Sequence, residues 1–175
     1  METTKNKLSQ QESIFFEKLR NYLDTPLYFY GSIQRDDYVP QYSDIDVNIF
    51  SNNEKDIIIK LQNFLNVDRN NFKKTLLKMK NTNIIIPGYK LKYNDEINKI
   101  NAEFAIFNEK NKNLIIELHK SKFSVSYFVC LIILFIKFLY YELKIIPSKI
   151  FRKLKYYFIG LTEEDNNNFI ILNMD

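Results

Sequence analysis

The spacing of apolar residues predicts two amphipathic helices in the first third of the chain. Apolar side chains recur every three or four positions over residues 8–23. Ser9 and Glu12 form the pattern of a capping box, so a helix is expected to start near Ser9 and to end at Pro26. A second helix is expected from residue 51 to about residue 65, with its apolar residues on one face.

Apolar runs and alternating segments predict the strands of a sheet. The expected strands lie at residues 27–30, 44–50, 84–86, 89–93, 102–107 and 114–118. A kink is expected at Pro87 and Gly88, and a polar hairpin loop over residues 108–113. Residues 33–43 predict a loop or a short helix, and residues 72–79 stay ambiguous between helix and strand. The pattern predicts an α+β fold, a mixed β-sheet flanked by helices.

The composition changes after residue 120, and we expect a division into a domain of residues 1–120 and a helical segment of residues 121–175. Residues 123–141 are almost entirely apolar, with Lys137 as the single charge. They predict one long helix over about 124–143, started by Ser121 or Ser124.

A short basic helix is expected after Pro147, and residues 169–172 form a short strand or none. Two alternatives stay open for the apolar helix: a helix packed on the domain, or a membrane-associated helix that spans or lies on a bilayer. If it packs, the stripe formed by Phe128, Ile132, Phe135 and Leu139 is expected to cover the domain, with Lys137 pointing away from it.

Composition excludes several classes of site. The 175 residues are 46% hydrophobic and 26% charged, as in a folded domain. Cys130 is the single cysteine and is expected to be a packing residue, so no intrachain disulfide forms. His119 is the single histidine and is expected at the surface, which removes zinc clusters, iron–sulfur clusters and a histidine triad.

The net charge of +4 is compatible with an anionic substrate. The abundance of Ile, Lys and Asn indicates an AT-rich genome, viral or cellular. Residues 1–10 lack an apolar core, so no secretory signal is expected, and we expect an intracellular, cytoplasmic location with membrane association left open.

Two short motifs indicate a catalytic site. Gly31-Ser32 lies at the end of a strand, and Asp44-Ile45-Asp46 lies at the start of the next. Side chains in a strand repeat with a period of two, so Asp44 and Asp46 lie on the same face. Two adjacent carboxylates repel each other, and a hard divalent cation such as Mg²⁺ or Mn²⁺ relieves that repulsion. The backbone of Gly31 and the hydroxyl of Ser32 are suitable donors to phosphate oxygens.

This pattern resembles the nucleotidyltransferase superfamily, which includes DNA polymerase β and the poly(A) polymerases. The resemblance implies a metal-dependent enzyme that moves a nucleoside monophosphate from an NTP to an acceptor and releases pyrophosphate. It implies that Asp44, Asp46 and a third carboxylate are the catalytic, metal-binding residues. Glu103 is the expected third carboxylate, Glu117 the second choice and Glu96 a weaker third.

The resemblance further implies that Gly31 and Ser32 bind the nucleotide, and it offers Lys137 as a lysine that contacts the triphosphate. Arg35, Lys90 and Lys92 are interpreted as ordinary surface charges. The acceptor stays open among an RNA end, a nucleotide, a small molecule and a protein hydroxyl. Two other functions stay open: a noncatalytic nucleotide-binding protein, and a protein that docks on a membrane or a partner through residues 123–158.

Overall fold

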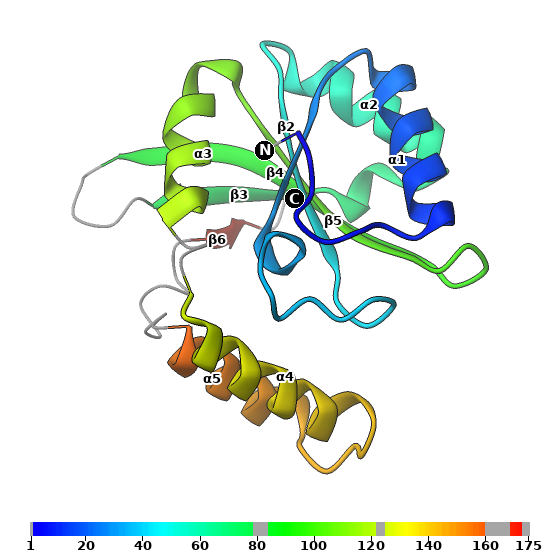
Figure 1. Ribbon diagram of the computed structural model, residues 1–175. Helices are drawn as coiled ribbons and strands as arrows, with labels where there is room; N and C mark the ends of the chain where they lie inside the picture. Colours follow the sequence, from blue (N-terminus) through cyan, green and yellow to red (C-terminus); the bar gives the residue numbers. More distant parts are fainter. Residues whose placement is uncertain (1, 79–83, 122–124, 160–168, 173–175) are drawn as a thin grey trace.

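Six strands form one mixed sheet in the order β1-β2-β5-β4-β3-β6 (Figure 1). The computed structural model describes residues 2–78, 84–121, 125–159 and 169–172. The strands are β1 (Leu27–Tyr30), β2 (Ile45–Phe50), β3 (Lys73–Lys78), β4 (Ile85–Asp95), β5 (Ile100–Phe107) and β6 (Phe169–Leu172). The α-helices are α1 (Gln10–Leu23), α2 (Glu54–Leu65), α3 (Lys112–Ser121), α4 (Tyr127–Tyr141) and α5 (Ser148–Phe158). The short 3₁₀ turns are η1 (Gly31–Gln34), η2 (Arg69–Asn71) and η3 (Glu109–Asn111).

The pairing of β2 with β5 is parallel, whereas every other pairing in the sheet is antiparallel. The parallel pair lies next to β1, so the strand that precedes Gly31, the strand that contains Asp46 and the strand that contains Glu103 are consecutive neighbours. Residues far apart in the sequence therefore meet at the ends of three adjacent strands.

Helices cover both faces of the sheet, and each face has its own core. The α1 and α2 helices pack on the face that carries Phe104 and Ile106. The α3 helix packs on the opposite face, where Ala105 and Phe107 lie, through the fully buried Ile115. Successive side chains of β5 point alternately into the two cores, because strand side chains alternate between the faces of a sheet.

Local signals in the sequence are confirmed at the amino end. The Ser9 side chain accepts a hydrogen bond from the Glu12 amide, and the Glu12 carboxylate accepts one from the Ser9 amide, so the expected capping box forms at the start of α1. The α2 helix also forms where expected and is capped by Asn53. The alternating segment becomes β2. These elements depend on short-range patterns that a sequence carries directly.

The predicted strand over residues 114–118 and its hairpin loop are wrong, because this segment is the helix α3 and the turn η3. Ile115 and His119 are buried while Glu117 is exposed, which is the three-to-four residue period of a helix that packs by one side. A short apolar run of this length does not distinguish a strand from one face of a helix. Packing against β2 and β5 decides between them.

The predicted kink at Pro87 and Gly88 is also absent, since β4 continues through both residues as one strand. Gly88 pairs with Thr75 on one side and with Phe107 on the other. A Cβ atom at Gly88 would lie 2.5 Å from the Phe107 ring, so glycine is needed here for close packing between strands rather than for a bend. The ambiguous segment before β4 contains β3, and β6 adds to the outer edge of β3.

The helices α4 and α5 form a hairpin below the sheet in Figure 1. The long apolar helix and the short basic helix both form, but α4 spans Tyr127–Tyr141 and starts at Ser126, whose side chain accepts a hydrogen bond from the Val129 amide. The expected start at Ser121 is therefore wrong, because Ser121 ends α3, and Ser124 lies outside the described residues. Within the described ranges, no helix combines the length and the apolar character that crossing a membrane requires.

The predicted packing stripe of α4 is wrong as well. Phe128 and Phe135 are 71% and 61% exposed, whereas Cys130 and Ile133 on another side of the helix are buried. Cys130 is thus a packing residue, as expected. A helix that is apolar on every side carries no periodicity to indicate which side packs, so only the contacts with its neighbours select it. The division of the chain at residues 120 and 121 stays a prediction.

Candidate active site

Three carboxylates predicted from the sequence lie on or beside the neighbouring strands β2 and β5, and we call them the carboxylate cluster: Asp44, Asp46 and Glu103. Asp46 and Glu103 are direct partners across the parallel pair, and Asp44 precedes β2 by one residue. Burial first, and then the negative charges of Asp44 and Glu103, raise the pKa of Asp46 well above its ordinary value. The cluster therefore concentrates negative charge in a half-buried place, where a cation would be favoured.

Gly31 lies against the Asp46 carboxylate. Its φ is +73°, and a Cβ atom there would lie 1.9 Å from the Asp46 Oδ2 atom. Tyr30 pairs with Asp46 across β1 and β2, so the chain turns from the end of β1 directly beside the carboxylate. Only glycine combines this left-handed backbone with this close approach. The structure thus joins Gly31 and Asp46, the two halves of the sequence motif, in one contact.

Two buried hydroxyl groups adjoin this contact. Ser32 is 3% exposed, and among the described residues its hydroxyl has no hydrogen-bond partner. The Tyr30 hydroxyl is likewise buried and without a partner there. Burial first, and then the charges of Asp46, Glu103 and Asp44, raise the pKa of Tyr30 well above its ordinary value. Because these two hydroxyls have no partner among the described residues, they are available to a ligand.

Lysines from β4 contact Glu103, and the sequence analysis did not anticipate this role. Lys90 donates a hydrogen bond to Glu103 Oε1, and the Lys92 Nζ atom lies 3.7 Å from Oε2. Both lysines follow from the register, since Lys92 is the direct partner of Glu103 and Lys90 points to the same face two residues earlier. The interpretation of Lys90 as an ordinary surface charge is wrong, because its side chain is only 19% exposed.

Carboxylate oxygens are the donors that Mg²⁺ and Mn²⁺ prefer, and the charges of Asp44 and Glu103 add to burial in raising the pKa of Asp46. The donor chemistry therefore fits a hard divalent cation. Within the described part of the chain, however, no group of three or more His, Cys, Asp or Glu side chains is arranged to hold a metal ion. The assignment of Asp44, Asp46 and Glu103 as metal ligands stays a prediction.

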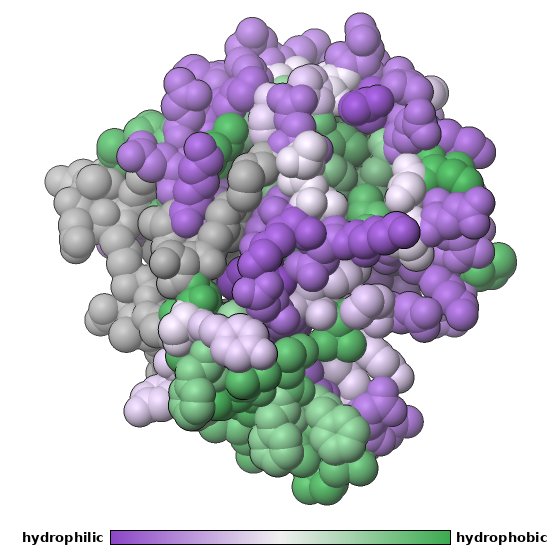
Figure 2. All heavy atoms as spheres, viewed as in Figure 1, coloured by the Kyte–Doolittle hydropathy of each residue, from purple (hydrophilic) through white to green (hydrophobic). Residues whose placement is uncertain are grey.

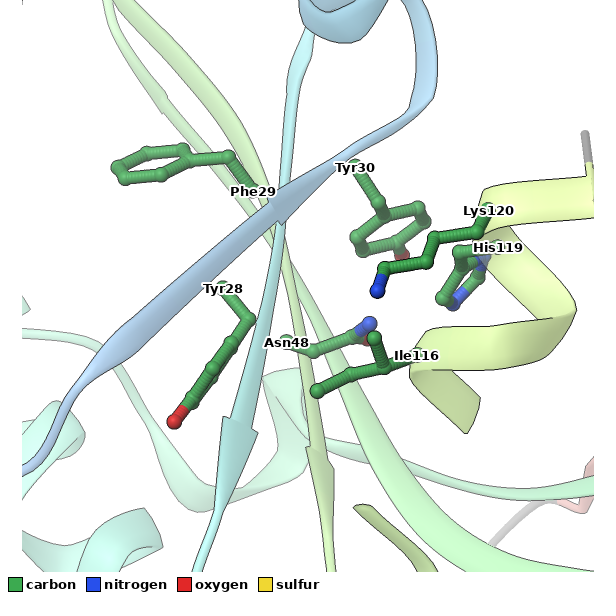
Figure 3. Close-up of a pocket in the computed structure, with 7 residues that line it drawn as sticks. All are labelled: Tyr28, Phe29, Tyr30, Asn48, Ile116, His119 and Lys120. Carbon is green, nitrogen blue, oxygen red and sulfur yellow. The ribbon is translucent and has the colours of Figure 1, made fainter. Parts of the chain in front are cut away.

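A small pocket lies on the same face of the sheet, between β1, β2 and α3 (Figure 3). The rings of His119 and Tyr30 stack there with centroids 4.1 Å apart, and the neighbouring Asn48 is buried. The expectation of a surface His119 is wrong, since it is 7% exposed. The four-residue spacing between Ile115 and His119 is typical of one face of a helix, and this spacing would have indicated a buried His119. The prediction of a strand over residues 114–118 placed His119 after that strand instead.

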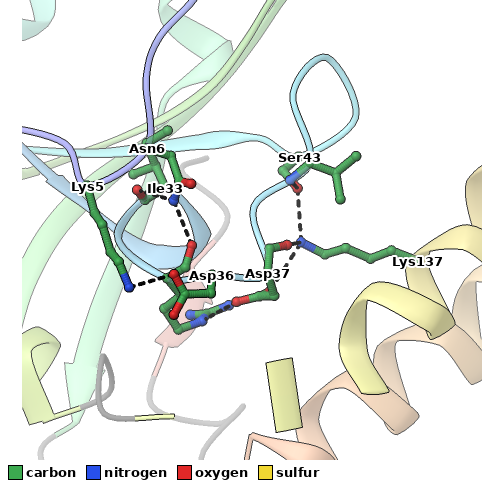
Figure 4. A network of polar contacts seen from close by, with 9 residues as sticks. Lys5, Asn6, Ile33, Asp36, Asp37, Ser43 and Lys137 are labelled. Carbon is green, nitrogen blue, oxygen red and sulfur yellow. Dashed lines mark hydrogen bonds and ion pairs between the residues drawn. The ribbon is translucent and has the colours of Figure 1, made fainter. Parts of the chain in front are cut away.

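Lys137 contacts the loop that follows η1 (Figure 4). It is 2% exposed, and its Nζ atom donates hydrogen bonds to the Asp37 carbonyl and to the Ser43 hydroxyl, 3.0 Å away. Nζ also lies 3.2 Å from the Asp37 carboxylate, which accepts hydrogen bonds from Arg35 Nε at 2.7 Å and Nη2 at 3.1 Å. We call Arg35, Asp37, Ser43 and Lys137 the Lys137 network.

The Lys137 network ties α4 to the loop between Gly31-Ser32 and Asp44-Asp46. Burial would raise the pKa of Asp37, but the hydrogen bonds and charges of Arg35 and Lys137 outweigh it and lower that pKa. Lys137 is buried on a side of α4 other than the predicted stripe, and Arg35 is buried rather than a surface charge. The role of Lys137 in nucleotide binding stays a prediction.

A lysine of the other helix of the hairpin acts on the carboxylates. The positive charge of Lys155, in α5, lowers the pKa of Asp46 and so opposes the larger effects of burial and of Asp44 and Glu103. The other two candidates for the third carboxylate lie elsewhere: Glu117 is exposed on α3, and Glu96 is exposed in the turn between β4 and β5. Glu103 is the only one of the three candidates that faces Asp46 across a strand pair.

Comparison with known proteins gives one family. The model of the nucleotidyltransferase domain matches residues 12–146. No curated protein matches the chain. Two solved structures of Cid1 poly(U) polymerase are similar to it, one bound to MgGTP (18% identity, TM-score 0.45) and a mutant bound to MgATP (17% identity, TM-score 0.46). They cover 77% and 81% of this chain, and the chain spans 44% and 46% of those polymerases.

Proposed function

The chain belongs to the nucleotidyltransferase domain family, and from this premise we propose that it transfers a nucleoside monophosphate from an NTP to a hydroxyl acceptor, with release of pyrophosphate. The observation that carries the proposal is the contact of Gly31 with Asp46, on a strand whose neighbour places Glu103 opposite Asp46. This contact brings a backbone turn suited to phosphate beside carboxylates suited to a cation.

In this proposal Asp44, Asp46 and Glu103 hold Mg²⁺ or Mn²⁺. A divalent cation bound there supplies Lewis-acid polarisation of the phosphate and neutralises the charge of the leaving pyrophosphate. The amide of Ser32 and its unpartnered hydroxyl donate to the triphosphate oxygens, and Gly31 leaves space for them to approach. Lys155 adds positive charge on the side of the helical hairpin, where Lys137 is engaged with Asp37.

The acceptor, the base and any RNA partner are not specified by these residues, so the assay surveys them. The full chain is incubated with each labelled NTP and Mg²⁺ or Mn²⁺, with and without RNA. Pyrophosphate release and label on RNA, protein or small molecules are measured. Asp46→Asn is expected to lower the transfer rate by about a thousandfold, since several kcal/mol of charge stabilisation are lost.

The matched control is Asp56→Asn, which makes the same change on the exposed side of α2, where Asp56 pairs with Lys60. It is expected to leave transfer unchanged. Asp46→Asn removes a half-buried carboxylate of raised pKa, so its thermal stability is expected to equal or exceed that of the natural chain. Undiminished transfer by Asp46→Asn would contradict the proposed mechanism.

A noncatalytic nucleotide-binding protein is the second candidate function, and the ion pairs of Glu103 with Lys90 and Lys92 favour it. If these pairs persist, Glu103 is not free to serve as a ligand. This candidate predicts nucleotide binding without pyrophosphate release under every metal and NTP tested. It also predicts that Glu103→Gln leaves the affinity for NTP unchanged, whereas the catalytic proposal predicts weaker metal-dependent binding.

A further inference from the structure

The solvent side of α4 is a large apolar surface. We call it the α4 stripe, formed by Tyr127, Phe128, Leu131, Phe135 and Phe138, which are 70%, 71%, 45%, 61% and 48% exposed. Figure 2 shows this apolar surface over the helical hairpin, below a mostly hydrophilic domain. With about 200 Å² for each large side chain, the stripe exposes roughly 600 Å². That is at the upper end of the largest patches on single-chain proteins, and such patches often mark interfaces.

The order of residues in the stripe fits another helix. Phe128, Leu131, Phe135 and Phe138 follow one another at intervals of three, four and three residues. This is the spacing of the seam along which two helices pack side by side with their side chains interlocked. Glu142, four residues beyond Phe138, is the first charged residue on this line. The matching surface is therefore a helix with its own apolar seam.

We propose that the α4 stripe is the interface of a homodimer, in which the α4 helix of a second copy packs antiparallel on the first. The stripe complements itself because every position in it is apolar, as a two-fold symmetric interface requires. Leu143 and Ile145, 48% and 68% exposed, continue the surface beyond the helix. With them each copy contributes about 800 Å², which is the size of a standard stable interface.

The antiparallel direction follows from charge. Glu142 lies at the carboxyl end of α4 and is exposed, while the amino end at Ser126 carries the positive end of the helix dipole. Antiparallel packing brings Glu142 of each copy beside the amino end of the other helix. Parallel packing would place the two Glu142 side chains together, where like charges repel.

A lipid surface fits the stripe less well. The stripe has the three- and four-residue spacing of a helix–helix seam, whereas the nearby basic residues lie outside it, on α5 and at Lys144. The single lysine of α4, Lys137, is buried on another side of the helix and contacts Asp37 and Ser43. The homodimer would therefore brace, from outside, the helix whose inner side holds the loop before Asp44.

The test is the mass of the full chain in solution, measured by light scattering and sedimentation equilibrium over a wide range of concentration. We expect twice the 21.1 kDa of one chain. Phe135→Glu is expected to give the monomer, and so is Phe128→Glu, because each places a charge in the seam. The matched control is Ile59→Glu, on the exposed side of α2, where the side chain is 54% exposed. This control is expected to remain a dimer.

Three results would overturn the proposal. A natural chain that is monomeric at all concentrations has no such interface. Dimers of Phe135→Glu and Phe128→Glu with unchanged circular dichroism would place the interface elsewhere. A monomer that sediments with phosphatidylserine vesicles, and no longer does so after Phe135→Glu, would assign the stripe to a membrane.

The direction of packing has its own test. Glu142→Gln is expected to weaken the dimer several-fold, because it removes the attraction to the amino end of the partner helix. A dimer strengthened by this substitution would overturn the antiparallel arrangement, since only parallel packing relieves a repulsion when the charge is removed.

Discussion

Two clusters of charged side chains each include residues of the segment between η1 and β2. They differ in whether each charge lies beside an opposite charge. In the Lys137 network, the Asp37 carboxylate accepts two hydrogen bonds from Arg35 and lies 3.2 Å from the Lys137 ammonium. In the carboxylate cluster, burial first and then the charges of Asp44 and Glu103 raise the pKa of Asp46. The first cluster is suited to hold the loop, and the second is suited to bind a cation.

The neutral hydroxyl groups around the two clusters differ as well. The Ser43 hydroxyl accepts a hydrogen bond from Lys137, whereas the Ser32 hydroxyl, buried beside the carboxylate cluster, has no partner among the described residues. A buried polar group that lacks a partner costs stability, so it persists where binding supplies the partner. The Lys137 network is thus internally matched, whereas the carboxylate cluster keeps a buried hydroxyl beside it that a ligand could engage.

The largest expected effect tests the Lys137 network as a structural element. Asp37→Asn leaves Arg35 and Lys137 buried without an anion, and we expect the free energy of unfolding to fall by about 3–5 kcal/mol in urea titrations. The control is the adjacent Asp36→Asn, because Asp36 pairs with Lys5 on the surface with both side chains about half exposed. A change below about 1 kcal/mol is expected for it. Equal losses in the two variants would contradict the distinction.

The next effect tests the contact between Gly31 and Asp46. Gly31→Ala forces a side chain into a left-handed backbone and against a carboxylate, so we expect a loss of about 1–3 kcal/mol in stability. Displacement of Asp46 is expected to lower nucleotidyl transfer by about a hundredfold. Ser32→Ala is the contrasting variant: stability is expected to be equal or higher, because a buried hydroxyl without a partner is removed, while transfer falls by about tenfold. Wild-type transfer in Gly31→Ala would rule out the close contact as part of the site.

A smaller effect separates the two lysines of the helical hairpin. Lys155→Met is expected to weaken NTP binding by about tenfold, measured by calorimetry, because one charge-assisted contact is lost. Lys137→Met is expected to leave NTP affinity unchanged, since the Lys137 ammonium is engaged with Asp37 and Ser43. The opposite result, with Lys137→Met as the weaker binder, would return the triphosphate contact to Lys137.

The smallest effect is a pH dependence of stability. Burial lowers the pKa of Lys137 from 10.5 to about 8, against the attraction of Asp37. Between these values the unfolded chain binds more of this proton than the folded chain, so the free energy of unfolding rises with pH. The slope from Lys137 is at most about 1.4 kcal/mol per pH unit. Urea titrations at pH 7.5 to 9.5 are expected to show this rise in the natural chain and not in Lys137→Met. Parallel profiles would exclude a depressed pKa at Lys137.

The family motif and the first elements of the fold were predictable because they depend on short-range patterns. The capping box of Ser9 and Glu12 and the alternation around Asp46 each lie within a few residues. The spacing between Gly31-Ser32 and Asp44-Asp46 is likewise local, and it led to the family that the comparison confirms. Chain neighbours determine these features, so a sequence shows them without knowledge of the fold.

The remainder was decided by tertiary structure. Residues 114–118 are as apolar as a strand, and only packing on the sheet makes them part of α3. The α4 helix is apolar on all sides, so its inner face follows from where Lys137 finds Asp37, 100 residues earlier in the chain. Contacts between distant segments, such as Lys137 with Asp37, depend on which surfaces come together once the sheet has formed. No local pattern encodes them, because the free energy that selects them comes from contacts between distant parts of the chain.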